Sequence, residues 1–176
     1  MNAKLADQMN RETDALLVVD VQKDFCPGGT LAIGDGDEIV PVLNRWIEAA
    51  KQRGVAIVAS RDWHPLHHVS FKERRGPWPA HCIRETAGAE FHDDLALPDD
   101  AMILSKATDK ERENYSVFDG SDLADRLRRR GVRRLWVGGL AQDICVLHTC
   151  LDGIKEDFEV HLLLPNPSDV YWGDLS

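Results

Sequence analysis

Side chains able to bind a metal ion are concentrated between residues 62 and 81. The candidate ligands in this stretch are Asp62, His64, His68 and His81. Imidazole and carboxylate groups suit zinc, manganese or iron, and ligands at positions i and i+2 can reach one ion from the end of a strand. Four of the seven histidines lie here, beside two tryptophans and three prolines that would stiffen the chain. Solvated histidines clustered by chance are the alternative, and we leave His67 out of the candidate set.

Five apolar segments are predicted to be β-strands. They are residues 15–19, 55–59, 101–104, 135–137 and 158–164. The first, second and fourth lack apolar–polar alternation, which indicates strands buried on both faces of a parallel sheet. Apolar residues recur every three or four positions over 39–50 and 123–132, which is typical of helices. This order predicts one α/β domain, a three-layer αβα doubly wound fold with a mostly parallel sheet.

Reactive side chains follow four of these strands at short distance. Asp20 and Asp62 come after the first two, Lys106 after the third, and Cys145 after the fourth. Because the carboxyl ends of parallel strands share one edge of the sheet, side chains far apart in sequence can converge there. Taken singly, Asp20 and Lys106 would more often be ordinary polar groups at strand ends.

Cys145 is the candidate nucleophile. It follows a strand and a glycine turn and opens a helical pattern, so the positive end of the helix dipole should lower the pKa of its thiol. Asp20 could take the thiol proton, while Lys106 holds Asp20 and the developing negative charge. Backbone N–H groups around Ala141 and Cys145 could form an oxyanion hole. The alternative is a buried structural cysteine, which we expect of the other three.

The overall composition limits the function classes. The chain has 176 residues, 43% of them hydrophobic and 29% charged, and we expect one domain over 1–176 with irregular ends at 1–13 and 165–176. No apolar run approaches the ~20 residues needed to cross a bilayer, and no secretory signal is evident, so we expect a cytoplasmic protein with no membrane partner. A net charge of -9 argues against nucleic acid as a partner. The absence of a C-x-x-C pair favours reduced thiols.

Five motifs in order resemble a known family. They are DVQKDFCPGG at 20–29, DWHPLHHVSF at 62–71, WPAHC at 78–82, SK at 105–106 and GLAQDIC at 139–145. They are similar to the nicotinamidases (pyrazinamidases) of the isochorismatase-like cysteine hydrolase superfamily. The resemblance covers roughly residues 14–164, and chance does not explain five separate matches.

The resemblance assigns roles to these residues. It implies a catalytic triad of Asp20, Lys106 and Cys145. It implies metal ligands at Asp62, His64 and His81, with His68 as a further, variable ligand. It implies substrate contacts at Phe25, Trp78 and Ala141, where the two aromatic rings sandwich a pyridine and the peptide before Ala141 is cis.

The implied reaction is hydrolysis of nicotinamide, a small amide, to nicotinate and ammonia through a Cys145 thioester, a step of NAD salvage and pyridine nucleotide biosynthesis. The implied cofactor is a divalent metal, with zinc favoured and iron or manganese as alternatives; in the family it contacts the ring nitrogen, directly or through water. Another amide or vinyl-ether substrate stays open as a second hypothesis. The metal cluster weighs against it, because metal-free branches lack these ligands together.

The C-terminus departs from the family pattern. Most members continue past the last apolar strand through a further helix and strand, whereas this sequence reaches Pro165 and Pro167 and stops nine residues later at Ser176. The resemblance therefore implies a sheet shortened at the C-terminus, with an edge or apolar patch that a partner subunit could cover in a homo-oligomer. A truncated, non-catalytic metal-binding or oligomer protein is the third hypothesis.

Overall fold

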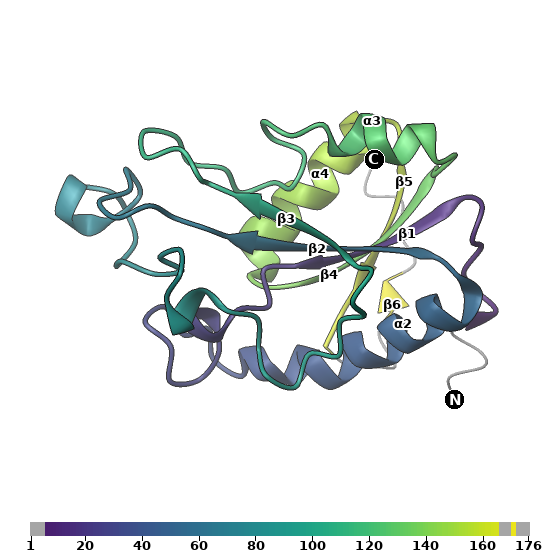
Figure 1. Cartoon of the computed structure of the whole chain (residues 1–176), viewed down its shortest axis with the longest axis horizontal. Helices are drawn as coiled ribbons and strands as arrows, with labels where there is room; N and C mark the ends of the chain where they lie inside the picture. Colours follow the sequence, from purple (N-terminus) through teal and green to yellow (C-terminus); the bar gives the residue numbers. More distant parts are fainter. Residues whose placement is uncertain (1–5, 166–169, 172–176) are drawn as a thin grey trace.

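The central sheet confirms the predicted strands. The computed structural model describes residues 6–165 and 170–171, and its strands are ordered β3-β2-β1-β4-β5-β6 (Figure 1). The strands are β1 Asp14–Val19, β2 Ala56–Asp62, β3 Met102–Lys106, β4 Arg134–Gly139, β5 Glu159–Leu163 and β6 Val170–Tyr171. The first five pair in parallel, and β6 pairs antiparallel with β5. The expected shortening at 165–176 falls mostly outside the described residues.

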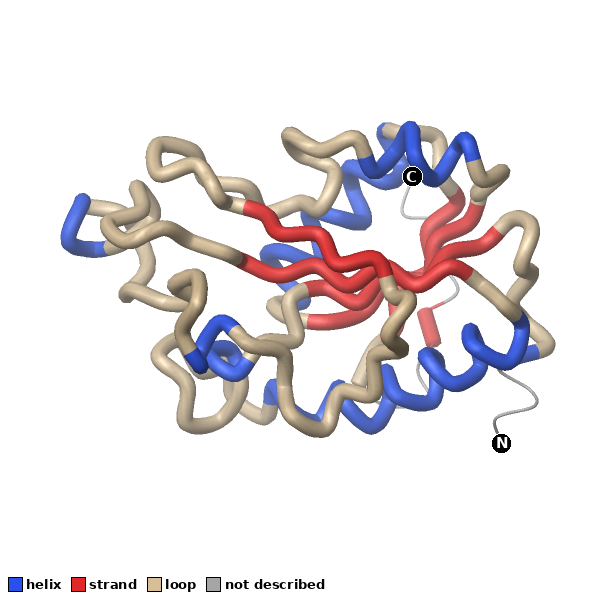
Figure 2. The backbone as a smooth tube through the Cα atoms, in the orientation of Figure 1, coloured by secondary structure: helices blue, strands red, loops and turns tan. Residues whose placement is uncertain are grey.

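Helices cover both faces of the sheet, as the αβα prediction requires (Figures 1 and 2). The helices are α2 Ile39–Arg53, α3 Leu123–Arg129 and α4 Leu147–Lys155. The shorter helical segments are η1 Lys23–Phe25, η2 Gly36–Glu38, η3 Lys72–Arg74, η4 Ala87–Ala89 and the π-helical η5 Gln142–Val146. Leu16 and Val18 of β1 pack with α2, whereas Leu17 and Val19 pack with α3 and the opposite core. This alternation places β1 at the centre of two hydrophobic cores.

Long loops extend beyond the carboxyl ends of β2 and β3, on the left of Figure 1. The regular structure between β2 and β3 is limited to the short helices η3 and η4 and to isolated bridges, which pair His64 with Ile83, Phe71 with Trp78, and Phe91 with Gln22 before η1. The Trp63 N–H also donates to the Lys106 carbonyl, which continues the β2–β3 pairing past the end of β2. These loops therefore begin from fixed strand ends. Among the described residues no helix combines the length and apolar character of a membrane span.

Candidate active site

A buried lysine joins two carboxylates at the ends of neighbouring strands. The Lys106 ammonium lies 2.7 Å from Asp20 Oδ2 and 2.5 Å from Asp62 Oδ1. Lys106 and Asp62 are paired across β2 and β3, and Asp20 directly follows β1, so the parallel register itself brings the three together. The Ser60 hydroxyl donates a hydrogen bond of 2.7 Å to Asp20 Oδ1. The three charged residues are at most 4% exposed, so their charges are compensated almost entirely by one another.

Burial and charge pairing set the proton affinities of this group. Burial raises the pKa of Asp20 to about 6, although the Lys106 ammonium beside it acts in the opposite direction. Burial also disfavours the charge of Lys106, but attraction to Asp20 and Asp62 outweighs this and raises the pKa of Lys106 well above its usual value. A carboxyl group with a pKa near neutrality can both accept and return a proton.

Cys145 joins this cluster from the segment after β4, the strand that lies on the other side of β1 from β2. It is the fourth residue of η5, directly after the loop that follows β4, and its Sγ lies 3.6 Å from Lys106 Nζ. Polar atoms of Cys145, Asp20 and Asp62 all lie within 4.8 Å of one another. The peptide between Leu140 and Ala141 is cis, as the resemblance implied.

The expected lowering of the thiol pKa is wrong for this site. Burial raises the pKa of Cys145 well above its ordinary value, although Lys106 favours the thiolate. The helix begins where the sequence predicted, but the dipole argument leaves out the cost of burying a negative charge. The resting sulfur is therefore a neutral thiol, and it must lose its proton to a neighbouring base when it reacts. Cys26, Cys82 and Cys150 are also buried, as expected.

Asp62, His64 and His81 form a group that fits a divalent metal. One ligand atom from each lies within 4.8 Å of the others. His64 Nδ1 lies 3.1 Å from the His81 carbonyl and His81 Nδ1 lies 2.7 Å from the Pro79 carbonyl. Because a carbonyl only accepts, both Nδ1 atoms carry a hydrogen, so in the neutral rings that bind a metal both Nε2 atoms offer a lone pair. Among the described residues the buried His64 Nε2 has no hydrogen-bond partner, which is the arrangement that a metal would satisfy.

His68 lies beside this group with both ring nitrogens engaged. Its ring centroid is 4.4 Å from that of His64. Its Nε2 lies 2.9 Å from the Arg112 carbonyl and its Nδ1 lies 2.8 Å from the Ser70 hydroxyl. The carbonyl requires a hydrogen on Nε2, so that nitrogen has no lone pair to offer a metal in this arrangement.

A cavity of about 250 Å³ opens onto both the metal-ligand group and the Cys145 thiol. Phe25, Trp78 and Ala141, the three expected substrate contacts, line it together with Asp62, His81 and Cys145. Phe25 is 4% exposed, whereas Trp78 lies on a loop and is half-buried. Trp78 Nε1 donates a hydrogen bond of 3.1 Å to the Tyr115 hydroxyl, which fixes the tilt of the indole. The cavity thus joins two aromatic walls, a thiol and a metal-ligand group.

Sequence reasoning missed three residues of this region: Gln22, Glu113 and Tyr115. Glu113 and Tyr115 line the same cavity from the loop after β3, and Gln22 is fully buried behind Asp62. The only available signal for Glu113 and Tyr115 was their position soon after Lys106, because their loop has no periodic pattern. Gln22 lies within the motif at 20–29, between Asp20 and Asp24, but its type alone suggests no chemistry.

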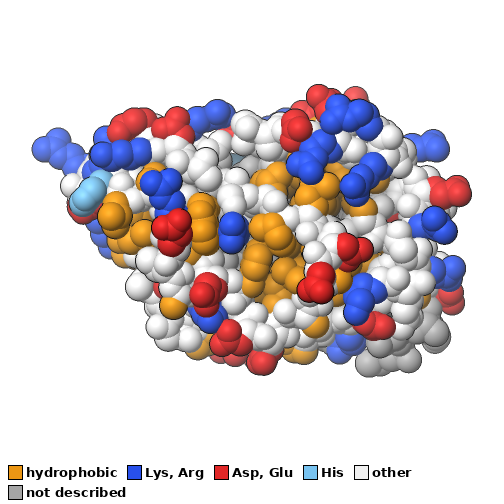
Figure 3. All heavy atoms as spheres, in the orientation of Figure 1, with side chains coloured by type: hydrophobic (Ala, Val, Ile, Leu, Met, Phe, Trp, Pro, Cys, Tyr) orange, Lys and Arg blue, Asp and Glu red, His pale blue; other side chains and the backbone are white. Residues whose placement is uncertain are grey.

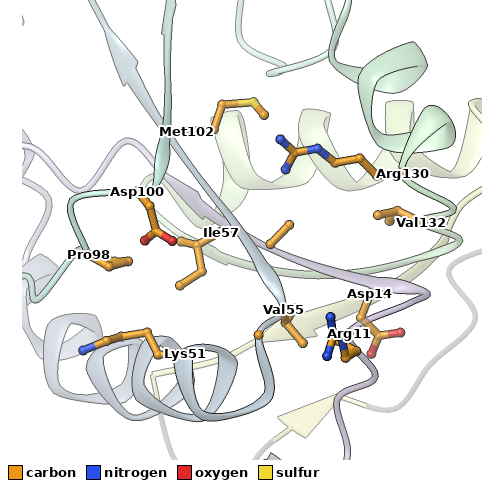
Figure 4. A pocket seen from close by; sticks show the side chains of 12 residues that line it. Arg11, Asp14, Lys51, Val55, Ile57, Pro98, Asp100, Met102, Arg130 and Val132 are labelled. Carbon is orange, nitrogen blue, oxygen red and sulfur yellow. The ribbon is translucent and has the colours of Figure 1, made fainter.

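A larger hollow of about 690 Å³ lies at the opposite, amino-terminal ends of the strands (Figure 4). Arg11, Lys51 and Arg130 contribute to its rim. Its one fully buried acid, Asp14, is already bound by Arg134 and Trp136. Figure 3, in the orientation of Figure 1, shows hydrophobic surface bordered by charged side chains in the middle of the face in view. Because the described residues that line this hollow include neither a thiol nor a metal-ligand group, its size does not make it the candidate site.

Comparison with known proteins agrees with the geometry. The model of the isochorismatase domain matches residues 14–164. The nicotinamidase of Escherichia coli (strain K12) is 36% identical over 170 residues, which cover 85% of this chain and 80% of that protein. The pyrazinamidase of Pyrococcus horikoshii in complex with zinc has a TM-score of 0.82 and 52% identity, covering 85% of this chain and 82% of its own. A protein of L. infantum in complex with nicotinate has a TM-score of 0.80 and 35% identity, covering 88% and 80%. The chain belongs to the isochorismatase family.

Proposed function

We propose that the chain is a metal-dependent nicotinamidase, which hydrolyses nicotinamide to nicotinate and ammonia. The observation that carries the proposal is one cavity lined by both the Cys145 thiol and the metal-ligand residues Asp62 and His81. The similarity to nicotinamidases and to a zinc-containing pyrazinamidase supports the same substrate class. A thiol alone would suit many acyl transfers, but the additional metal group suits a substrate that carries a ring nitrogen.

In the first half of the reaction, Asp20 is the general base. It takes the proton of Cys145 as the sulfur attacks the carboxamide carbon, so that a carbon–sulfur bond forms while negative charge develops on the oxygen. N–H groups at Ala141 and Cys145 stabilise that oxygen. Asp20 then gives its proton to the leaving nitrogen, the carbon–nitrogen bond breaks, and ammonia departs. Lys106 keeps its positive charge beside Asp20 in every step.

In the second half, one water molecule attacks the nicotinoyl thioester. Asp20 takes a proton from the water, the carbon–sulfur bond breaks, and the Cys145 sulfur recovers the proton from Asp20. Nicotinic acid is released, loses its remaining proton to solvent to become nicotinate, and the site returns to its starting state. The raised pKa of Asp20, about 6, suits this exchange, because the carboxyl group must be both a base and an acid within one turnover.

The substrate ring is held between Phe25 and Trp78, whose faces suit a flat heteroaromatic. Asp62, His64 and His81 hold the metal, for which their oxygen and two nitrogen donors fit zinc, iron or manganese, and we favour zinc because the pyrazinamidase of P. horikoshii contains it. When bound, the ion supplies a Lewis acid that orients a nitrogen lone pair of the substrate.

The cellular setting is part of this proposal. Consumption of nicotinamide places the enzyme in NAD salvage, and four free cysteines suit the reducing cytoplasm. Association with a second copy of the chain stays a prediction, which light scattering of the purified protein would test.

The test is an ammonia assay on nicotinamide with wild type and Cys145→Ala, each loaded with zinc, manganese or iron. We expect ammonia release by the wild type, loss of release with chelator, and at least a thousandfold lower rate in Cys145→Ala, as is usual when a nucleophile is removed. Equal rates of the two proteins with each metal would refute the proposal. Chelator-insensitive turnover of a non-pyridine amide would favour the second hypothesis.

A further inference from the structure

Glu113 presents a carboxylate to the nitrogen that the metal-ligand group leaves without a partner. It lies on the loop after β3, its side chain is 21% exposed, and it lines the active-site cavity. Its Oε1 lies 3.8 Å from His64 Nε2. The Asn114 N–H donates a hydrogen bond of 2.9 Å to the same oxygen, which holds the carboxylate in place.

The distance between these two atoms is informative. At 3.8 Å it exceeds the ~3.2 Å limit of an ordinary N–H···O hydrogen bond, and the hydrogen of the His64 ring is already on Nδ1. In the neutral His64 ring a lone pair therefore faces a carboxylate, which is unfavourable in a buried place unless a cation lies between them. Two atoms that each bind one ion at about 2.0–2.2 Å stand at most about 4.4 Å apart. His81 Nε2 and Asp62 Oδ2 show a similar spacing, 3.9 Å.

His68 competes with Glu113 for the same role, because His64, His68 and Glu113 form a second group of ligand atoms within 4.8 Å. The structure separates the two. His68 Nε2 carries a hydrogen directed at the Arg112 carbonyl, whereas Glu113 Oε1 has lone pairs to spare and a full negative charge. A carboxylate also needs no change of tautomer before it can bind a cation.

We propose that Glu113 is a fourth protein group of the metal site formed by Asp62, His64 and His81, and contacts the ion or a water molecule on it. His68 is then a positioning residue, which packs on the His64 ring and holds the Arg112 backbone. This inference rests on the metal site of the proposed function. It gives the site a second carboxylate, which increases its affinity for a divalent cation and does not itself take part in bond making.

The test measures metal affinity rather than activity. Metal-free wild type, Glu113→Gln and His68→Gln compete with a chromophoric chelator for zinc and, separately, for manganese. The matched control is Glu111→Gln, two residues away on the same loop, whose carboxylate is exposed and pairs with Arg74. Circular dichroism of the metal-free proteins verifies that each variant is folded.

We expect Glu113→Gln to weaken binding of both metals by about ten- to a hundredfold, the usual effect of removing a group that supports a metal site. Glu111→Gln should keep the wild-type affinity, and His68→Gln should lose less than Glu113→Gln. Wild-type affinity in folded Glu113→Gln, or a larger loss in His68→Gln, would overturn the inference. Either result would leave nicotinamide hydrolysis by the wild type unaffected, so the two proposals fail separately.

Discussion

Replacing the buried Gln22 with leucine should destabilise the protein far more than the same change at an exposed glutamine. The side chain is fully buried between the end of β2 and the last residue of η4, Ala89. Its Nε2 donates to the Asp62 carbonyl at 2.8 Å and to the Ala89 carbonyl at 2.9 Å, and its Oε1 accepts from the Asp62 N–H at 2.8 Å. The backbone of a proposed metal ligand is thus held by one amide group.

The expected magnitude follows from these three hydrogen bonds. Leucine is similar in size but leaves one buried N–H and two buried carbonyls without a partner, and each unsatisfied group costs about 1–3 kcal/mol. We therefore expect the free energy of unfolding to fall by roughly 3–9 kcal/mol, a large part of the ~5–15 kcal/mol of a typical domain. Release of the Asp62 backbone should also weaken metal binding.

Urea denaturation of the metal-free proteins measures this loss without a contribution from bound metal. Gln52→Leu is the matched control, because Gln52 is exposed and its amide reaches only Glu48 on the same helix. We expect the control to change the free energy of unfolding by less than about 0.5 kcal/mol. If Gln22→Leu also stayed within 1 kcal/mol of wild type, the three hydrogen bonds would not hold this edge as described.

Three further predictions concern the same region. Gly139→Ala should lower the free energy of unfolding by about 3–5 kcal/mol, because φ at this residue is +147° and a Cβ would lie 2.0 Å from the Val19 carbonyl oxygen. Gly34→Ala is the control, since its Cβ would meet nothing within 4 Å and the change should be neutral. Thermal unfolding of both variants measures the difference. Ser60→Ala should reduce kcat/KM at least tenfold, since a hydrogen bond to a charged group contributes about 1.5–3 kcal/mol; an unchanged kcat/KM would separate Ser60 from Asp20. Finally, kcat/KM should fall as pH drops through about 6, because Asp20 must be deprotonated to act as base; a flat profile between pH 5 and 7 would exclude that role.

The strands and their shared edge could be predicted because buried parallel strands leave a simple record. Apolar runs such as 15–19 have no alternation, and polar residues such as Asp20 and Asp62 follow immediately at the end that a doubly wound fold uses for ligands. Once the strands are parallel, convergence of Asp20, Asp62 and Lys106 needs no further information. The five motifs supplied the order and the expected roles.

The rest depends on contacts that local patterns do not encode. The pKa of Cys145 is raised because the thiol is buried, while its sequence context shows only the start of a helix. Glu113 reaches His64 through a loop without periodicity, and Gln22 becomes important only when the segment at Ala89 folds against it. In each case the deciding quantity is burial among residues that are distant in sequence, which a single sequence does not display.

The central claim is that the Cys145 sulfur carries the acyl group of the substrate. Mass spectrometry of metal-loaded enzyme, quenched with acid during turnover of nicotinamide, tests this most directly. We predict a nicotinoyl group on the peptide that contains Cys145, absent from Cys145→Ala and from enzyme without substrate. Release of ammonia at an undiminished rate, with no modified cysteine at any quench time, would contradict the account.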